Sequence, residues 1–324
     1  MSRVEFAILG AGAMGSIVAA HLARAGRSIA VLARGQRAAH VSQHGLRIGG
    51  LVEFTVPVTV LTDPASLRAA EVLIVATKAL GTAAALAPLR GASIDLALSI
   101  QNGVMKNELL ADAFGAERVL GALANTSGEL LSDGSVLFTR NVNLAVGEFE
   151  ADVSPRAQRV ALALETSGVH SRAMPRLRDQ EWTKFVAWVG LAALSVTTRL
   201  GTWKYFSDRS SALVLARIVR EAGALARALD VRLADESILP VATLCSATEE
   251  QAVDILVKMG EDYRVHSPQH RLSTLQDLEA GRPLEIDETM GYAVRKSREL
   301  GLALPLLQNF FEVASAIDRT RRLQ

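Results

Sequence analysis

The feature of this sequence that most constrains its fold is a glycine-rich turn near the N-terminus. The turn reads Gly10-Ala11-Gly12-Ala13-Met14-Gly15. It follows an apolar run, Val4 to Leu9, that predicts a β-strand, and it precedes a helical stretch, Ser16 to Ala25. In that context Gly10 permits a tight turn, Gly12 lets a pyrophosphate approach the backbone, and Gly15 allows close helix packing. The pattern predicts a dinucleotide-binding βα unit, the alternative being a plain βα turn with incidental glycines.

The first half of the chain continues to alternate β-rich and helical stretches. Further strands are expected at Ser28 to Ala33, Val72 to Ala76 and Leu96 to Ile100. This alternation predicts a parallel sheet with helices on both faces. From Val119 to Glu148 the pattern changes to short β runs broken by turn residues, which predicts hairpins that extend the same sheet, and one more strand is expected near Val169 to Met174.

After Pro175 the strand signals almost vanish and Ala/Leu/Arg-rich helical patterns follow. The expected helices are Asp179 to Leu200, Ser210 to Leu229, Thr248 to Met259, Glu285 to Leu300, and Pro305 to Arg319. A length of 324 residues with 49% hydrophobic content suffices for two buried cores. The sequence therefore predicts a Rossmann-type α/β domain over residues 1–175 and an all-α domain over residues 176–324.

Composition narrows the possible partners. Lys+Arg minus Asp+Glu is 35 − 34 = +1, so there is no net field to hold nucleic acid or an anionic membrane, and a small-molecule substrate is favoured. The longest uncharged apolar run, between Lys184 and Arg199, is shorter than a membrane span. A single cysteine, Cys245, and no His-Glu-x-x-His pairing argue against a metal site. A soluble, cytoplasmic protein is expected.

The end of the second predicted strand indicates which dinucleotide binds. The segment Ala33-Arg34-Gly35 carries no acidic residue to hold a ribose diol, and Arg37 follows it. The Arg34 guanidinium can instead pair with a 2′-phosphate, which favours NADP(H) over NAD(H). The alternative is an exposed loop arginine.

Polar side chains also follow two later strands. Lys78 lies in Ala76-Thr77-Lys78-Ala79, and Asn102 lies in Gln101-Asn102-Gly103. Both should emerge at the carboxyl edge of the sheet, where open α/β sheets bind ligands, and can contact the cofactor and the substrate. For Asn102 an ordinary Asn-Gly turn is an equal alternative.

The second domain offers a lysine and a polar segment. Lys184 stands at the head of the most apolar helix, where partial burial would lower its pKa and make it a better proton donor near neutral pH. A lysine that snorkels from a helix end is the simpler alternative. Near the C-terminus, Ser273 to Asp287 is too polar for a core; its Glu285 could merely favour a helix dipole or could take part in chemistry.

Together these residues resemble the ketopantoate reductase (2-dehydropantoate 2-reductase) family. The shared motifs are the glycine turn, Leu32-Ala33-Arg34-Gly35, Thr77-Lys78-Ala79, Gln101-Asn102-Gly103, Trp182-Thr183-Lys184-Phe185 and, most specifically, Ser273 to Asp287. The resemblance implies hydride transfer from NADPH to a 2-keto acid in an interdomain cleft, as in the conversion of ketopantoate to pantoate in pantothenate biosynthesis. It also implies a monomer or a homodimer.

The resemblance assigns roles to individual residues. Lys184 would polarise the ketone and donate the proton, and Glu285 would lie near the cofactor and the reacting hydroxyl. Ser273 would bind substrate. On the cofactor side Asn102 would lie beside the nicotinamide, Lys78 would line the cleft, and Thr126 is a further cofactor candidate.

The chain departs from the family where asparagines usually follow the catalytic lysine by one and two helical turns. Trp188 and Ala192 stand there, on the lysine's face of the helix, and Trp188 is expected to line the substrate site. Met290-Gly291 replaces a frequent Asn-Gly, and Thr202 stands where a further substrate asparagine can occur. We therefore expect retained 2-keto acid reduction with ketopantoate as a poor substrate.

Two rival functions remain open. Another two-domain dehydrogenase, of the hydroxyacid or opine type, would share the general plan, although the Glu285-Ile286-Asp287 block weighs against it. A non-catalytic NADP(H)-binding sensor that has lost its substrate site would also explain Trp188.

Overall fold

A computed structural model describes residues 3–321 of the chain. The chain separates into two compact units, Met1–Arg178 and Asp179–Gln324. The first is an α/β unit and the second is helical, as the sequence predicted. The sequence placed the boundary between residues 175 and 176; the helix that begins at Leu177 runs from the first unit into the second.

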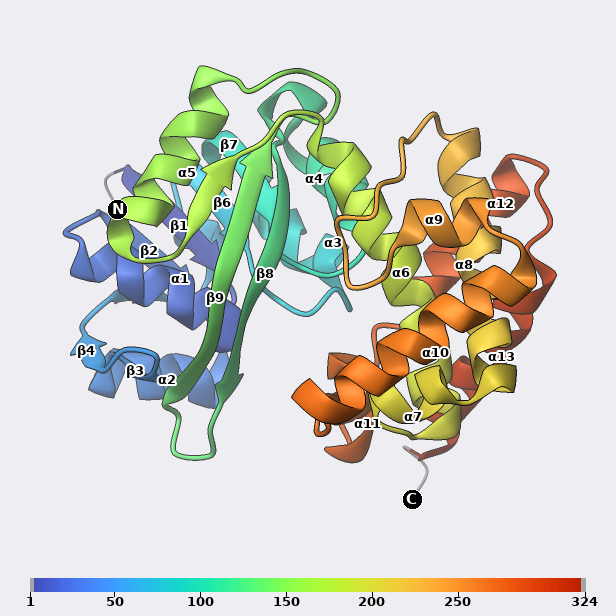
Figure 1. Cartoon of the computed structure of the whole chain (residues 1–324). Helices are drawn as coiled ribbons and strands as arrows, with labels where there is room; N and C mark the ends of the chain where they lie inside the picture. The colour runs from blue at the N-terminus through green and yellow to red at the C-terminus, as the bar shows by residue number, and fades with distance from the viewer. Residues whose placement is uncertain (1–2, 322–324) are drawn as a thin grey trace. The chain divides into compact units, whose positions relative to one another are not determined.

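The first unit is built on a parallel five-stranded sheet with the order β5-β2-β1-β6-β7 (Figure 1). Its strands are β1 (Val4–Leu9), β2 (Ile29–Leu32), β5 (Thr59–Leu61), β6 (Ala69–Val75) and β7 (Ser93–Ser99). Because every pairing is parallel, the loops after β1, β2, β6 and β7 all leave the same edge of the sheet. This is the Rossmann-like arrangement that the alternating pattern predicted.

A second sheet accompanies the first and was not predicted. It has the order β10-β9-β3-β4, with β8 paired to β9. Its strands are β3 (Leu46–Gly50), β4 (Phe54–Val56), β8 (Gly121–Leu130), β9 (Val136–Gly147) and β10 (Ser171–Ala173).

The expectation that the region from Val119 to Glu148 extends the first sheet is therefore wrong beyond its first residue. Val119 makes one isolated bridge to Ala97 of β7, after which β8 leaves that sheet. The physical reason lies in packing: Phe138, Leu144 and Val146 of the hairpin are buried in the same cluster as α1. Strand alternation in the sequence marked the hairpin but did not specify which sheet it joins.

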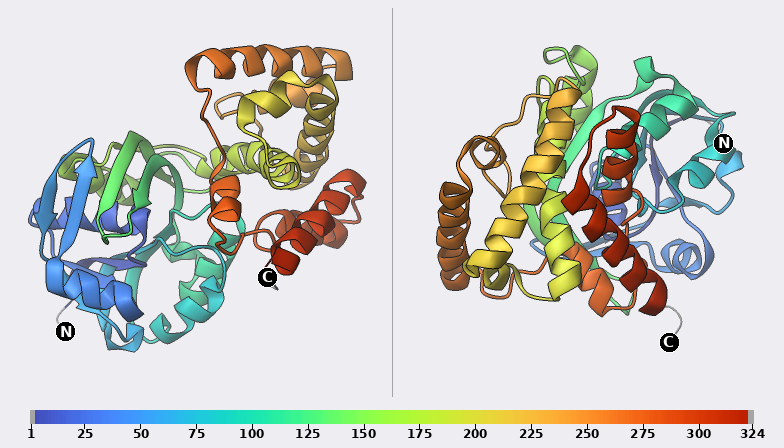
Figure 2. Two further views of the ribbon diagram at one scale, coloured as in Figure 1. Left: turned by 90° about the horizontal axis from the view of Figure 1, so that it is seen from below. Right: turned by 90° about the vertical axis from the view of Figure 1, so that its right-hand side faces the viewer.

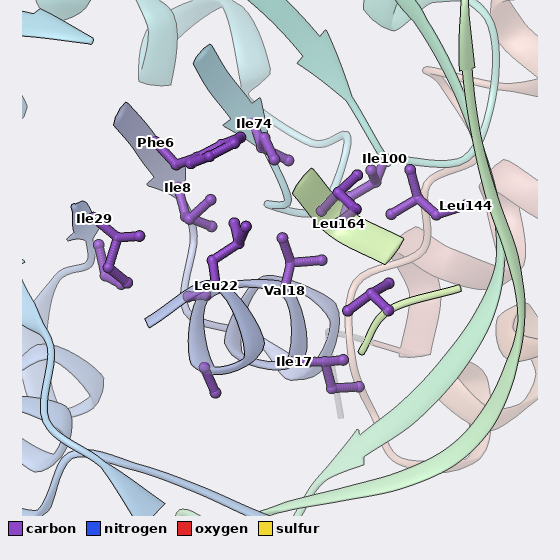
Figure 3. Packing of buried hydrophobic residues seen from close by; sticks show 14 of the residues in the cluster. Phe6, Ile8, Ile17, Val18, Leu22, Ile29, Ile74, Ile100, Leu144 and Leu164 are labelled. Atoms are coloured by element: carbon purple, nitrogen blue, oxygen red, sulfur yellow. The ribbon is translucent and has the colours of Figure 1, made fainter. Parts of the chain in front are cut away.

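Helix α1 (Ala13–Arg24) is the centre of the first unit's larger core. Val18 and Leu22 on this helix point towards Phe6 and Ile8 of β1, and Ile17 points to the other side, where it meets Gly128 of β8 (Figure 3). Leu144 of β9 and Leu164 of α5 belong to the same buried cluster. The other face of the first sheet has its own apolar cluster, which explains why its strands read as continuous hydrophobic runs.

Four further α-helices complete the first unit. They are α2 (Gly35–His44), α3 (Thr82–Leu86), α4 (Met105–Phe114) and α5 (Pro155–Ser167). The sequence carried a start and a stop signal for α5: the Ser154 side chain accepts a bond from the Ala157 amide, Pro155 occupies the first turn, and Gly168 ends the helix with φ +101°.

The second unit contains only helices among its described residues (Figure 2). They are α6 (Leu177–Thr198), α7 (Thr202–Ser207), α8 (Arg209–Ala228), α9 (Val241–Ser246), α10 (Glu249–His266), α11 (Ser273–Glu279), α12 (Met290–Glu299) and α13 (Pro305–Arg321). Helix α8 packs against α7, α9, α10, α12 and α13. Within residues 3–321 no helix has both the length and the apolarity that a membrane crossing requires.

One predicted helix begins later than expected. The sequence placed its start at Glu285, whereas α12 begins at Met290. The Leu284 amide instead donates to Asp318 of α13, 3.2 Å away, and the Thr289 hydroxyl donates to the Glu285 carbonyl. These bonds hold residues 285–289 as an irregular segment, so Glu285 does not act as a first-turn helix residue.

Candidate functional site

The glycines of the first turn differ in what they are needed for. Gly10 has φ +107°, and a Cβ there would lie 2.9 Å from the Thr77 amide nitrogen. A Cβ on Gly15 would collide with the Gly10 carbonyl. Gly12, by contrast, has φ −69° and nothing within 4 Å of the Cβ position, so the fold itself would accept alanine there. An absent side chain facing open space fits a ligand that approaches the backbone from outside.

The start of α1 is suited to an anion. No side chain caps this helix N-terminus at Gly12, and the first turn contains no acidic residue. The amides of the first turn therefore present positive dipole ends to whatever occupies the space beside Gly12. A pyrophosphate fits this donor set.

The end of β2 also fits a negatively charged group. Arg34 is exposed and precedes α2, whose first turn has neither an acidic residue nor a side-chain cap. Arg37 differs from Arg34: it is half-buried, and its guanidinium already donates to three acceptors, the nearest being the Gly134 carbonyl at 2.6 Å. Of these two arginines, only Arg34 is placed for a phosphate at the surface.

Lys78 and Asn102 emerge at the same edge of the sheet as the glycine turn. Lys78 is exposed and Asn102 half-buried. Gln101, to which the sequence analysis assigned no role, links their loops: its side-chain Nε2 donates to the Thr77 hydroxyl at 3.0 Å and to the Lys78 carbonyl at 3.0 Å. Its position directly before Asn102 in the motif was the available signal.

A buried lysine holds the backbone next to Asn102 by hydrogen bonds. Lys106 of α4 is 5% exposed, and its Nζ donates to the carbonyls of Ser99 (2.9 Å), Gln101 (3.1 Å) and Ala122 (2.6 Å). The ammonium thereby joins the end of β7 to the start of β8. Sequence reasoning missed Lys106, because a lysine in the first turn of a short helix is typical of a solvated position.

Thr126 lies on β8, between two irregularities in its pairing with β9. It is 7% exposed, and among the residues described its Oγ1 is one of the few buried polar atoms that lack a hydrogen-bond partner. A buried hydroxyl without a partner is costly unless something else satisfies it. This geometry is compatible with the expectation that Thr126 contacts a cofactor.

In the second unit, Lys184 lies on an almost wholly buried stretch of α6. From Glu181 to Val196 it is the one residue that is not buried. Trp188 and Ala192, one and two turns further along, are both buried. Nearby, the rings of Trp182 and Phe185 pack edge-to-face with centroids 5.4 Å apart, and Tyr292 of α12 adjoins both.

The polar segment before α12 is held in place by charged side chains. Asp277 accepts from the Arg282 Nε at 2.7 Å, and Arg321 of α13 donates to the Leu278 carbonyl at 2.9 Å. Within this frame Ser273 is exposed as the first residue of α11, and Glu285 is buried. Lys184, Ser273 and Glu285 thus all belong to the second unit, and the glycine turn, Arg34, Lys78, Asn102 and Thr126 to the first.

Comparison with known proteins identifies the family. The family model of the ketopantoate reductase PanE/ApbA N-terminal domain matches residues 6–151, and that of its C-terminal domain matches residues 176–318. The chain belongs to the ketopantoate reductase family. A 2-dehydropantoate 2-reductase from Archaeoglobus fulgidus is 28% identical over 318 residues, covering 98% of each chain.

Solved structures share the fold along the whole chain. A PanE/ApbA family ketopantoate reductase from Ralstonia eutropha aligns with a TM-score of 0.82 and 24% identity, covering 98% of this chain and 99% of the other. A D-mandelate dehydrogenase solved with NADH aligns with a TM-score of 0.80 and 18% identity, covering 98% and 99%.

One further feature of this ketopantoate reductase homologue lies beside Glu285. Glu288 is half-buried, and desolvation, followed by its neighbours Asp287 and Glu285, raises the pKa of its carboxyl. Its Oε2 is buried and lacks a hydrogen-bond partner among the described residues. Within residues 3–321 no group of three His, Cys, Asp or Glu side chains is arranged so that it could hold a metal ion.

Proposed function

We propose that this protein reduces a 2-keto acid to a 2-hydroxy acid with NADPH. The observation that carries the proposal is the pairing of two features in one family member: a Gly12 turn open to a ligand, and a single partly exposed lysine on a buried helix. The relatives at 22–30% identity that carry the name 2-dehydropantoate 2-reductase support the same reaction type.

The choice of NADPH over NADH rests on Arg34. This exposed guanidinium at the start of α2, with no acid in the helix's first turn, suits a dianionic 2′-phosphate better than a ribose diol. The glycine turn and the N-terminus of α1 would hold the pyrophosphate, and Thr126, Lys78 and Asn102 would complete the contacts from the neighbouring strands.

The chemistry in the second unit would rest on Lys184. When bound, NADPH would supply the hydride that the carbonyl carbon of the substrate accepts. The Lys184 ammonium would hydrogen-bond the ketone oxygen, stabilise the negative charge that develops there and donate the proton that completes the hydroxyl group. Glu285 would orient the same hydroxyl, and Ser273 would bind the substrate's polar end.

The substrate side chain is proposed to be less polar than that of ketopantoate. Trp188 and Ala192 on α6 and Met290 at the start of α12 are buried, and none of them can offer an amide to a hydroxyl group. A site lined by such residues favours a keto acid with an aliphatic or aromatic side chain, because a buried hydroxyl without a partner would be penalised.

A substrate panel tests the proposal directly. Oxidation of NADPH is measured with ketopantoate, with 2-ketoisovalerate and with phenylglyoxylate, each over a range of concentrations. We expect turnover of at least one keto acid, with a higher kcat/KM for the two apolar acids than for ketopantoate. Efficient ketopantoate turnover would overturn the substrate preference alone. Absence of turnover with every keto acid, despite tight NADPH binding, would instead favour a non-catalytic NADP(H)-binding sensor.

A further inference from the structure

Arg37 contacts three structural elements of the first unit at once. Its Nε donates to the Ala11 carbonyl at 2.7 Å, inside the glycine turn. One terminal nitrogen donates to the Gly134 carbonyl at 2.6 Å, at the tip of the β8–β9 hairpin, and the other to the Ser16 hydroxyl at 2.9 Å, on α1. The Ser16 hydroxyl in turn donates to the same Ala11 carbonyl at 3.1 Å.

The bond to Ala11 determines the direction of the next amide. The Ala11 carbonyl and the Gly12 N–H belong to one peptide unit, and in a trans peptide these two groups point in opposite directions. No peptide bond of the described chain is cis. Because Arg37 and Ser16 both draw the carbonyl oxygen towards themselves, the Gly12 N–H points the other way. A carbonyl turned outward would repel an anion at that position, whereas an N–H attracts one.

Through its bond to Gly134, Arg37 also connects the glycine turn to the β8–β9 hairpin. Gly134 has φ +81° in the hairpin turn, where Asp133 also accepts from Arg47 of β3 at 2.6 Å. The hairpin tip is thus bonded to both α2 and β3, which lie close to it (Figure 1). The same hairpin carries Thr126, whose buried hydroxyl lacks a partner among the described residues.

We propose that Arg37 is a positioning residue for dinucleotide binding: it holds the Ala11–Gly12 peptide and the β8–β9 hairpin in the arrangement that the cofactor requires, without contacting the cofactor's 2′-phosphate. The proposal rests on the proposed function, since it presumes that a dinucleotide binds at the turn. A planar fork with three donors is needed, because the three acceptors lie on three different elements. A lysine ammonium can bond only acceptors that surround one nitrogen, whereas the acceptors of Arg37 each bond a different nitrogen of the guanidinium.

The test measures the affinities for NADPH and NADH separately, by calorimetry without keto acid. For Arg37→Ala we expect both affinities to fall about tenfold or more, with their ratio unchanged within about threefold. Arg37→Lys should not rescue either. With the best keto acid, KM for NADPH should rise while kcat at saturating NADPH stays within about twofold.

Two matched variants define the comparison. Arg34→Ala should weaken NADPH binding and leave NADH binding unchanged, so that the ratio of the NADPH affinity to the NADH affinity falls. Arg90→Ala removes an exposed arginine that precedes β7, at the amino edge of the sheet, and should leave both affinities unchanged.

The outcomes separate the alternatives. If Arg37→Ala loses NADPH affinity alone, Arg37 is a phosphate contact and the positioning role is overturned; unchanged binding of both cofactors also overturns it. Should Arg37→Ala fail to fold, Ser16→Ala removes one acceptor and one donor of the same network, and wild-type affinities in that variant would overturn the proposal. If the wild-type protein binds neither dinucleotide, the proposed function falls and this inference falls with it.

Discussion

The two units hold their candidate functional groups in different ways. In the first unit the glycine turn, the Asn102 loop and the β8–β9 hairpin are joined by side chains that cross between elements, chiefly Gln101, Lys106 and Arg37. In the second unit Lys184 stands on a long helix whose neighbouring positions are buried by apolar packing.

The difference indicates where each part tolerates change. A site made of backbone groups depends on many supporting hydrogen bonds, so its geometry is distributed over residues that touch no ligand. A site made of one side chain on a packed helix concentrates its chemistry in that side chain and its selectivity in the positions one and two turns away. If this contrast holds, the largest single effect on turnover belongs to Lys184, and substitutions in the first unit act through stability and cofactor binding.

Removal of Lys184 should abolish most turnover while cofactor binding persists. For Lys184→Ala we expect kcat to fall by about 10²–10⁴-fold, because the proton donor and the charge opposite the developing alkoxide are lost together. The dissociation constant for NADPH, measured by calorimetry, should remain within about twofold of the wild type.

Lys258→Ala serves as the control for this experiment, since it removes an exposed lysine from α10. If kcat of Lys184→Ala stays within threefold of the wild type, the chemistry does not depend on this one side chain. Such a result would favour either another acid or the non-catalytic alternative.

Replacement of Lys106 should weaken the first unit itself. Lys106→Met keeps an apolar stem of similar length but leaves the carbonyls of Ser99, Gln101 and Ala122 without their shared donor. We expect the free energy of unfolding of this unit to fall by about 2–3 kcal/mol. Urea denaturation followed by far-UV circular dichroism measures the change. With Arg90→Ala as the control, an equal stability of both variants would show that the ammonium contributes nothing net.

A smaller effect is expected from acid. His21 of α1 is buried, its Nδ1 bonds the Ile17 carbonyl at 2.8 Å, and burial lowers the pKa of its imidazole. Below about pH 6.5, His21 binds a proton in the unfolded chain but stays neutral in the folded unit. The free energy of unfolding of the first unit should therefore decline as the pH falls. In His21→Leu that decline should be shallower between pH 7.5 and pH 5.5. An identical pH dependence would show that other groups cause it.

Local features of the fold were predictable and long-range ones were not. Val4–Leu9 is a strand with the predicted bounds, and the glycine turn follows it, because both signals lie within a few consecutive residues. The second sheet was missed because the residues of β3 pair with residues of β9 that lie 88 positions further along the chain, and strand patterning carries no information about such distant partners.

The supporting residues of the site were hidden for the same reason. Arg37 and Lys106 look like surface cations in the sequence, and their acceptors, such as Gly134 and Ala122, come from distant segments. For Glu285 the sequence misplaced the helix start, because Asp318 of α13 captures the Leu284 amide. The roles assigned to Lys184, Ser273 and Glu285 came from family motifs and remain predictions.

The cluster of Trp182, Phe185 and Tyr292 is part of an uneven distribution of aromatic residues that has an optical consequence. All three tryptophans and all three tyrosines of the chain lie in the second unit, so the first unit contributes no indole or phenol absorption. Intrinsic emission excited near 295 nm therefore reports on the helical unit alone. Fluorescence therefore follows the unfolding of the second unit, and far-UV circular dichroism follows the unfolding of the whole chain. Comparison of the two signals shows whether the units unfold together or one after the other.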